Sequence, residues 1–190
     1  MEIKPMDSTE WYKVDGDHTY RTNYDLKDSS IIVDIGARAG AWCDLVKGQK
    51  FCFEPIVEYC NVLREKGYNT YRYAVSDIHG QGLLGETDGE ASLLKPNGNI
   101  QCELIPAESI FYIIGHDIVD VMKINVEGAE YQILSNLIDN NVIQNIKNIQ
   151  VQFHVLDNSE ELYNEIASQL SKTHKLTWRF PFIWENWELK

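Results

Sequence analysis

Apolar and polar positions along the chain alternate with two periods, one typical of strands and one typical of helices. Short, largely apolar runs predict strands at residues 31–35, 50–53, 70–75, 117–127 and 146–155. Apolar residues at helical spacing predict helices at residues 41–46, 56–66, 108–114, 129–140 and 160–170. Because strands and helices follow each other in turn, the pattern favours a doubly wound α/β fold with a mostly parallel sheet.

Three segments fall outside this alternation. Residues 1–30 are polar and acidic, with a turn expected at 15–17, and should pack over the sheet or over a site as a lead-in segment. Residues 79–106 contain short strand-like pieces between glycines, which favours an antiparallel excursion. Residues 175–178 and 182–187 are typical of a terminal hairpin. Its aromatic residues could stack on a sugar, but we interpret them as the packed face of an edge hairpin; they are Trp178, Phe180, Phe182, Trp184 and Trp187.

Length, charge and cysteine content narrow the class of protein. The 190 residues are expected to form a single domain, 1–190, with a full hydrophobic core. A formal net charge of −12 repels a phosphate backbone, so a nucleic-acid partner is disfavoured. The four cysteines lack the spacing of a metal site, and no metal is expected. The sequence shows neither a signal-peptide pattern nor a membrane-spanning apolar run, so a cytoplasmic protein is expected.

The first predicted strand ends in a turn suited to ligand binding. It reads Ile-Ile-Val-Asp-Ile, and Gly36 and Gly40 follow it at the expected start of a helix. Glycines there let backbone amides approach a ligand, although they also occur in plain turns. Glu54 closes the next strand, 18 residues after Gly36, where an acid can accept hydrogen bonds from ribose hydroxyls. Taken alone, Glu54 could be a solvated glutamate at the end of a strand. Together, the glycine turn and Glu54 favour a nucleotide-like ligand.

Two neighbouring predicted strands each carry a polar face, whereas a central parallel strand should be apolar on both faces. The polar positions are Lys123, Asn125 and Glu127 in the first, and Gln150, Gln152 and His154 in the second. One alternative is a cleft, and the other is a sheet edge that is merely wet. We favour the cleft because both polar series run to the carboxyl ends of their strands, where ligands bind in parallel sheets.

Four blocks of sequence together point to a known family: residues 33–40, 53–55, 74–77 and 123–130. They resemble the FkbM-type family of S-adenosylmethionine-dependent methyltransferases over roughly residues 15–155. The block from Lys123 to Glu130 is the most specific, whereas the glycine turn is shared by most class I methyltransferases. The resemblance implies a Rossmann-like class I methyltransferase fold, with a mostly parallel seven-stranded sheet whose last strand is antiparallel, and it implies S-adenosyl-L-methionine as the cofactor.

The resemblance also implies which residues hold this cofactor. They are Asp34, Gly36, Ala37 and Gly40 around the methionine part, Glu54 at the ribose hydroxyls, Ser76 and Asp77 beside the adenine, and Asn125 near the methyl group. Glu127 would lie near the methyl group and the acceptor, and His154 matches a strand-end histidine often seen in the family.

The catalytic residues are less defined, because the family usually has Asp where this chain has Asn125. An amide orients a hydroxyl but cannot act as a base, so either His154 or Glu127 takes that role, or the protein is not an efficient catalyst. His154 is the first candidate, since its unperturbed pKa lies near neutral pH; a histidine that is simply satisfied at a strand end is the alternative. Glu127 could instead cap the following helix, and Lys123 could pair with Glu127 or steer an acidic acceptor.

The predicted function is therefore O-methylation of a hydroxyl group on a sugar, glycan or small-molecule acceptor, with the sugar inferred from the resemblance. A nicotinamide-dependent oxidoreductase would share the turn and the ribose acid, but the third glycine of its fingerprint is missing. A non-catalytic cofactor-binding or interaction module stays open because of Asn125.

Overall fold

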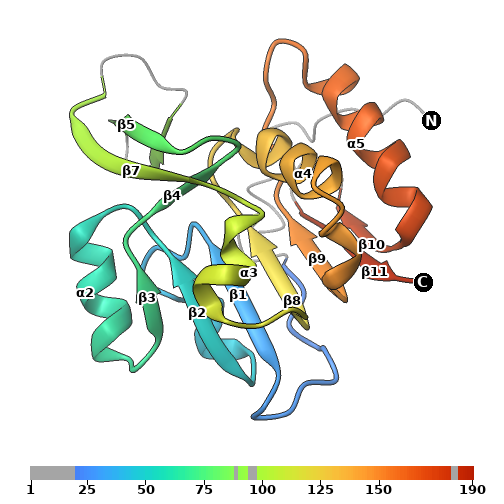
Figure 1. Cartoon of the computed structure of the whole chain (residues 1–190), viewed down its shortest axis with the longest axis horizontal. Coiled ribbons are helices and arrows are strands. Elements are labelled where there is room, and N and C mark those ends of the chain that lie inside the picture. Colours follow the sequence, from blue (N-terminus) through green and yellow to red (C-terminus); the bar gives the residue numbers. More distant parts are fainter. Residues whose placement is uncertain (1–19, 88–89, 94–97, 181–183) are drawn as a thin grey trace.

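In a computed structural model of the chain, the structure describes residues 20–87, 90–93, 98–180 and 184–190. Its main sheet has seven strands in the order β10-β11-β9-β8-β1-β2-β3 (Figure 1). The strands are β1 Ile31–Ile35, β2 Gln49–Phe53, β3 Asn69–Tyr71, β8 Val121–Ile124, β9 Asn148–Val151, β10 His174–Phe180 and β11 Trp184–Leu189. β11 pairs antiparallel with both neighbours, and the strands from β9 to β3 pair in parallel. The predicted fold class is thereby confirmed.

Helices cover both faces of this sheet, as a doubly wound fold requires. One face packs against α3 Ser109–Ile114, α4 Glu130–Asp139 and α5 Ser159–Thr173, which bury the larger apolar cluster. The other face packs against α2 Val57–Glu65 and a short 3₁₀ helix, Cys43–Leu45, where the spacing predicts a longer helix over 41–46. Within the described residues, no helix is both long and apolar enough to cross a membrane.

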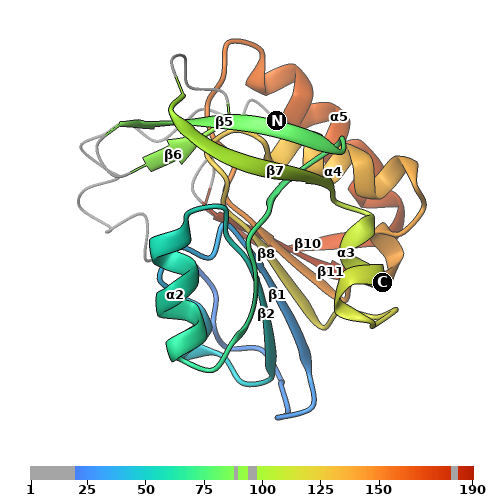
Figure 2. The same ribbon diagram turned by 60° about the vertical axis from the view of Figure 1, so that its left-hand side comes forward.

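A second, smaller sheet lies beyond the carboxyl ends of the main strands (Figure 2). It contains β4 Ala74–Ser76, β5 Gly80–Thr87, β6 Glu90–Ser92 and β7 Ile100–Pro106. β5 pairs antiparallel with both β6 and β7, which confirms the antiparallel excursion. The single strand predicted at 70–75 is wrong: the chain turns at Tyr71, whose carbonyl accepts the Tyr73 N–H at 3.0 Å, and its two halves join different sheets.

The described part of the lead-in segment crosses the second face of the main sheet. The Arg21 N–H donates to Gln150 Oε1 at 2.5 Å, and the Tyr24 hydroxyl donates to Asn186 Oδ1 at 2.8 Å. The Arg21 carbonyl in turn accepts the Trp42 indole N–H at 3.1 Å. These contacts explain why Gln150 and Asn186 can be polar on interior strands, because each side chain pairs with the lead-in segment that covers this face. The turn predicted at 15–17 lies outside the described residues.

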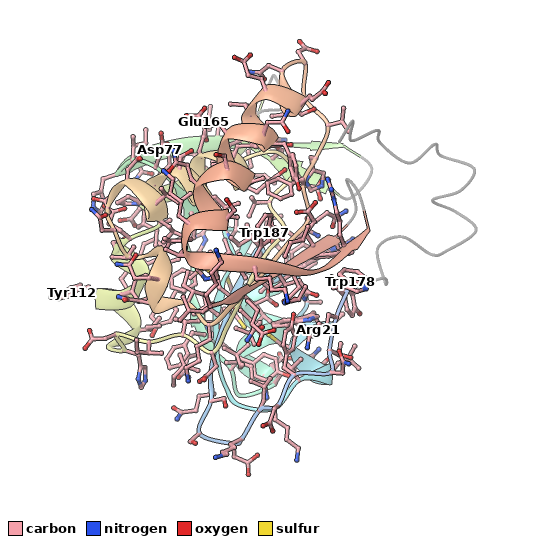
Figure 3. The ribbon with its side chains drawn as sticks, turned by 90° about the vertical axis from the view of Figure 1, so that its right-hand side faces the viewer. Arg21, Asp77, Tyr112, Glu165, Trp178 and Trp187 are labelled. Atoms are coloured by element: carbon pink, nitrogen blue, oxygen red, sulfur yellow. The ribbon has the colours of Figure 1, made fainter. Side chains whose placement is uncertain are left out.

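The terminal hairpin is present as β10 and β11. Figure 3, which faces this hairpin and α5, shows Trp187 between them and Trp178 farther along the hairpin. Trp187 is buried in the apolar cluster with Tyr163 of α5, in agreement with a packed face. Trp184 is also buried, but it borders a cavity on the other face of the sheet. Phe182 and the side chain of Phe180 lie outside the described residues.

Candidate active site

A cavity of about 590 Å³ lies at the carboxyl ends of β1, β2 and β8. This volume is within the usual range for small-molecule and cofactor sites. Its wall includes the turn after β1, Glu54 after β2, and Asn125 and Glu127 after β8. Because β8 and β9 are interior strands, their polar face is not a wet sheet edge. The cleft predicted from side-chain alternation is present at β8, whose polar series lines the cavity, but the second polar series, Gln150, Gln152 and His154, does not line it.

Gly36 brings the end of β8 directly against the turn after β1. Its φ is +73°, and a Cβ at this position would lie only 1.8 Å from the Asn125 carbonyl oxygen. The Gly36 N–H donates to the Phe53 carbonyl at 3.0 Å, and the Asn125 N–H donates to the Ile35 carbonyl at 3.0 Å. Only glycine combines the left-handed backbone with this close approach. Gly36 and Ala37 both line the cavity.

Asp34 and Lys123 support this turn, and of the two only Lys123 lines the cavity. Lys123 Nζ pairs with Asp34 Oδ1 at 2.9 Å and donates to the Gly36 carbonyl at 3.0 Å. Both side chains are almost completely buried, and the Cys43 thiol donates to the second Asp34 oxygen at 3.2 Å. Asp34 therefore holds Lys123, which in turn holds the glycine turn. Of the alternatives for Lys123, an ion pair is present, but its partner is Asp34 rather than Glu127.

Glu54 connects the turn with the start of α2. Its side chain is 5% exposed and accepts the Arg38 N–H at 2.8 Å and the Ile56 N–H at 2.9 Å. Burial raises the pKa of Glu54, and these two donors offset only part of that effect. Glu54 also lines the cavity. Each carboxylate oxygen has two acceptor positions, so the side chain has capacity left for ligand hydroxyls.

Ser76 and Asp77, which are predicted to lie beside the adenine, do not line the cavity. The two side chains bond to each other at 3.0 Å, and Tyr73, Ala74 and Val75 line the cavity instead. Gly40 also lies off the cavity, and a Cβ there would lie 2.8 Å from Leu63 Cδ2 of α2. Tyr59, Tyr73 and Ile56 form an apolar slot beside Glu54 that sequence reasoning missed. The one sequence feature that could have indicated these residues is that they lie close in the chain to Glu54 and Ala74, which belong to the blocks 53–55 and 74–77 that resemble the family.

The turn after β8 carries two candidate groups into the cavity. Asn125 Oδ1 is buried and has no hydrogen-bond partner among the described residues. Glu127 has a φ of +56°, which is strained for a residue other than glycine. Ser92 of β6 donates its hydroxyl to the Glu127 carbonyl at 2.7 Å, so the small sheet is joined to this turn. Strain of this kind persists where the surroundings fix it, and it clusters at functional sites.

His154 lies behind Glu127 and does not line the cavity. Its Nε2 is 3.2 Å from Glu127 Oε2, and its Nδ1 is 3.1 Å from Glu130 Oε1. Burial alone would lower the pKa of His154, but the two carboxylates outweigh it and raise the pKa to about 10. A histidine that is protonated at neutral pH has no free lone pair with which to accept a proton. The geometry therefore favours a role in holding Glu127, and the predicted base role of His154 stays a prediction.

This pairing makes stability depend on pH. Below pH 6.5, the ordinary pKa of histidine, both folded and unfolded states carry the proton, and the stabilisation is complete. As pH rises towards 10, the free energy of unfolding should fall by up to about 1.4 kcal/mol per pH unit, reduced by the partial exposure of the pair. Urea titrations between pH 6 and 10 measure this slope. His154→Gln should flatten it, and His79→Gln, at an exposed histidine, should not; equal slopes in both variants would contradict the pairing.

The fold and the cavity together define a class I, cofactor-binding α/β protein. The Methyltransferase FkbM domain family matches residues 34–176. The chain therefore belongs to the FkbM methyltransferase family, and it is an S-adenosylmethionine-dependent methyltransferase. This confirms the predicted family and cofactor. No group of three or more potential metal-ligating side chains occurs among the described residues.

The chain is also similar in fold to several solved structures. A putative rRNA methylase from Clostridium thermocellum is 13% identical, with 98% of each chain covered and a TM-score of 0.48. TrmK from M. capricolum, solved with S-adenosylhomocysteine, is 13% identical with a TM-score of 0.41; the match covers 87% of this chain but only 64% of TrmK. An S-adenosylmethionine-dependent methyltransferase from Aquifex aeolicus is 13% identical, with 97% and 98% covered and a TM-score of 0.41. No curated protein matches the chain in sequence.

Proposed function

We propose that the protein methylates a hydroxyl oxygen of a sugar, glycan or small-molecule acceptor. The observation that carries this proposal is one cavity whose wall includes the glycine turn, Glu54, Asn125 and Glu127. A methyl donor held by the glycine turn and Glu54 and a hydroxyl held by Asn125 and Glu127 would meet within this cavity. Such a site positions the reactants and limits the access of water.

Residues on the cavity wall fit the cofactor. Gly36 and Ala37 would border its methionine part, Glu54 would accept the ribose hydroxyls, and the slot beside Tyr59 and Tyr73 would take the adenine. The unpartnered Asn125 Oδ1 lies where a polar ligand group would complete its hydrogen bonding. Asp34, Gly40, Ser76 and Asp77 stand outside this wall, so we propose supporting roles for them. When bound, S-adenosylmethionine supplies an electrophilic methyl group.

Glu127 is the proposed proton acceptor. It lines the cavity, and its carboxylate is held by the protonated His154. An acceptor hydroxyl that donates to Glu127 is oriented for attack, and its proton becomes more acidic as the oxygen forms its new bond. Glu127 then takes that proton, which is the step that Asn125 cannot perform. Lys123 stays with Asp34 and Gly36, so we propose that it shapes the site rather than reacting.

Charge favours an uncharged acceptor over a nucleic acid. Two carboxylates line the cavity, and of the two cations on its described wall Lys123 pairs with Asp34 and Arg38 donates to the Tyr59 hydroxyl. The chain carries a net charge of −12. Binding of an RNA backbone depends on cationic groups that neutralise its phosphates. The C. thermocellum protein is described as a putative rRNA methylase, so RNA is included in the test as the competing acceptor.

Two measurements on the full chain test this function. S-adenosylhomocysteine at about 100 times its dissociation constant should stabilise the protein by about 2.7 kcal/mol, or roughly 5 to 10 °C, whereas NAD should not. Radiolabelled methyl groups should then pass to neutral glycans or small alcohols and not to tRNA or rRNA. A shift with NAD alone would indicate an oxidoreductase. A shift with S-adenosylhomocysteine but no transfer to any acceptor would indicate a binding module, and transfer to RNA alone would refute the acceptor class.

A further inference from the structure

The cavity has an aromatic end that the cofactor assignment leaves unused. There Tyr20 of the lead-in segment and Trp184 of β11 both line the cavity, as Asn125 and Glu127 do. The two rings meet edge to face, with centroids 5.8 Å apart and an interplanar angle of 88°. Trp184 is 1% exposed, yet it lies away from the apolar cluster that contains Trp187. The chain thus places two aromatic rings on the wall of the cavity that Glu127 also lines.

A row of unpaired polar atoms runs across the same end. Lys123 pairs in register with Gln150, and Gln150 with Asn186. Two residues farther along these strands, the same register and the same sheet face bring together Asn125, Gln152 and Trp184. Among the described residues, Asn125 Oδ1, Gln152 Oε1 and Trp184 Nε1 are buried with no hydrogen-bond partner.

These atoms make up one donor and two acceptors on adjacent strands. A buried polar group without a partner typically destabilises a fold by about 1 to 3 kcal/mol, and such groups are rare in native proteins. Asn125 and Trp184 line the cavity, and Gln152 lies between them in the row without lining it. A ligand at this place that completes the row accounts for all three. That ligand must offer both donors and acceptors, as hydroxyl groups do.

The surrounding charges define the ligand further. Lys123, which lies on the same face, is neutralised by Asp34 at 2.9 Å, and Glu127 is held by His154. Among the described residues that line the cavity, the two cations are Lys123, which is paired with Asp34, and Arg38, which donates to the Tyr59 hydroxyl at 3.4 Å beside Glu54. Aromatic rings combined with a few placed polar groups are typical of sites for neutral ligands with apolar ring faces.

We propose that Trp184, Gln152 and Asn125, together with Tyr20, form the acceptor subsite and bind a neutral, polyhydroxylated ring such as a pyranose. The aromatic rings contact the apolar face of the sugar. Trp184 Nε1 donates to one of its hydroxyl groups, and the amide oxygens of Gln152 and Asn125 accept from others. This subsite rests on the proposed function, because it defines the acceptor of that same methyl transfer.

Saturation-transfer NMR on the full chain with S-adenosylhomocysteine tests the subsite. The probes are methyl α-glucopyranoside, methyl α-galactopyranoside and methyl α-mannopyranoside, compared with glucose 1-phosphate and catechol. At least one neutral glycoside should give signal, and Trp184→Phe, which keeps the ring but removes the indole donor, should weaken its affinity about tenfold. Trp187→Phe is the matched control, because its Nε1 already bonds to Glu185 at 3.0 Å away from the cavity. Binding of catechol or the phosphate alone, or no loss in Trp184→Phe, would overturn the subsite.

Gln152→Leu keeps the test valid if Trp184→Phe loosens the sheet. Removing a buried amide oxygen that has no partner among the described residues should leave stability unchanged or raise it, while glycoside affinity still falls about tenfold. Unchanged affinity in this variant would overturn the subsite. The proposed function can fail separately from the subsite. Glycoside binding that depends on Trp184, without methyl transfer to any acceptor, would retain the subsite and refute the proposed methyl transfer. Methyl transfer with wild-type KM in both variants would support the proposed function and overturn the subsite.

Discussion

Gly36→Ala should abolish cofactor binding while the protein retains a measurable folded state. A methyl group at this position would lie 1.8 Å from the Asn125 carbonyl oxygen, far inside contact distance, and φ is +73°. The end of β8 must move away from the turn after β1, which displaces Asn125 and Glu127 together. Left-handed strain and overpacking should together destabilise the fold by at least about 3 kcal/mol. Thermal unfolding with and without S-adenosylhomocysteine measures both effects, and the ligand-induced shift should be lost.

Gly67→Ala is the matched control for this variant. Gly67 has a φ of +80°, but a Cβ there would meet nothing within 4 Å. The same backbone strain is therefore present without the collision, and the expected loss is about 1 kcal/mol with a normal ligand shift. If Gly36→Ala kept the wild-type shift, the turn would not be the cofactor site. If both variants lost stability equally, the close approach to Asn125 would not matter.

The order of elements was predictable because it follows from periodicity. Val33 and Ile35 are buried on one face of β1 and Ile32 on the other, as an interior parallel strand requires. The break between Tyr71 and Ala74 was not predictable, because both halves have strand-like sequence. Only the pairing of Ala74–Ser76 with β7, a segment about thirty residues later, separates them. Register between distant segments is a tertiary property that local pattern does not contain.

In the candidate site, too, features that are local in sequence were predictable, and contacts between distant segments were not. Gly36 and Glu54, which both line the cavity, are predictable from spacing, since a strand, a turn and a strand-end acid lie close together in sequence. Asp34 was placed at the ligand, but in the structure its carboxylate faces Lys123, which comes from β8. Trp184 and Tyr20 lie at opposite ends of the chain and meet at 5.8 Å. Their contact depends on the antiparallel insertion of β11 beside β9, which no local signal reports.

Glu127→Gln should reduce methyl transfer by about 10²- to 10⁴-fold, the usual contribution of a general base. The amide is nearly isosteric and keeps a hydrogen bond to the acceptor, but it cannot take the hydroxyl proton. Cofactor affinity should stay within about twofold, because Glu54 and the glycine turn are untouched. Single-turnover transfer with saturating S-adenosylmethionine separates the chemical step from binding. Glu161→Gln, at an exposed glutamate in the first turn of α5, is the control and should retain wild-type turnover.

A second readout distinguishes a lost base from a disturbed turn. His154 owes its raised pKa partly to Glu127, so Glu127→Gln should lower the pKa of His154 and shift the loss of stability to lower pH. NMR titration of the His154 ring follows this change directly. Slow transfer together with a lowered His154 pKa is the result that assigns proton transfer to Glu127 and positioning to His154. Wild-type transfer in Glu127→Gln would remove Glu127 as the base, and transfer lost in His154→Gln alone would return that role to the histidine.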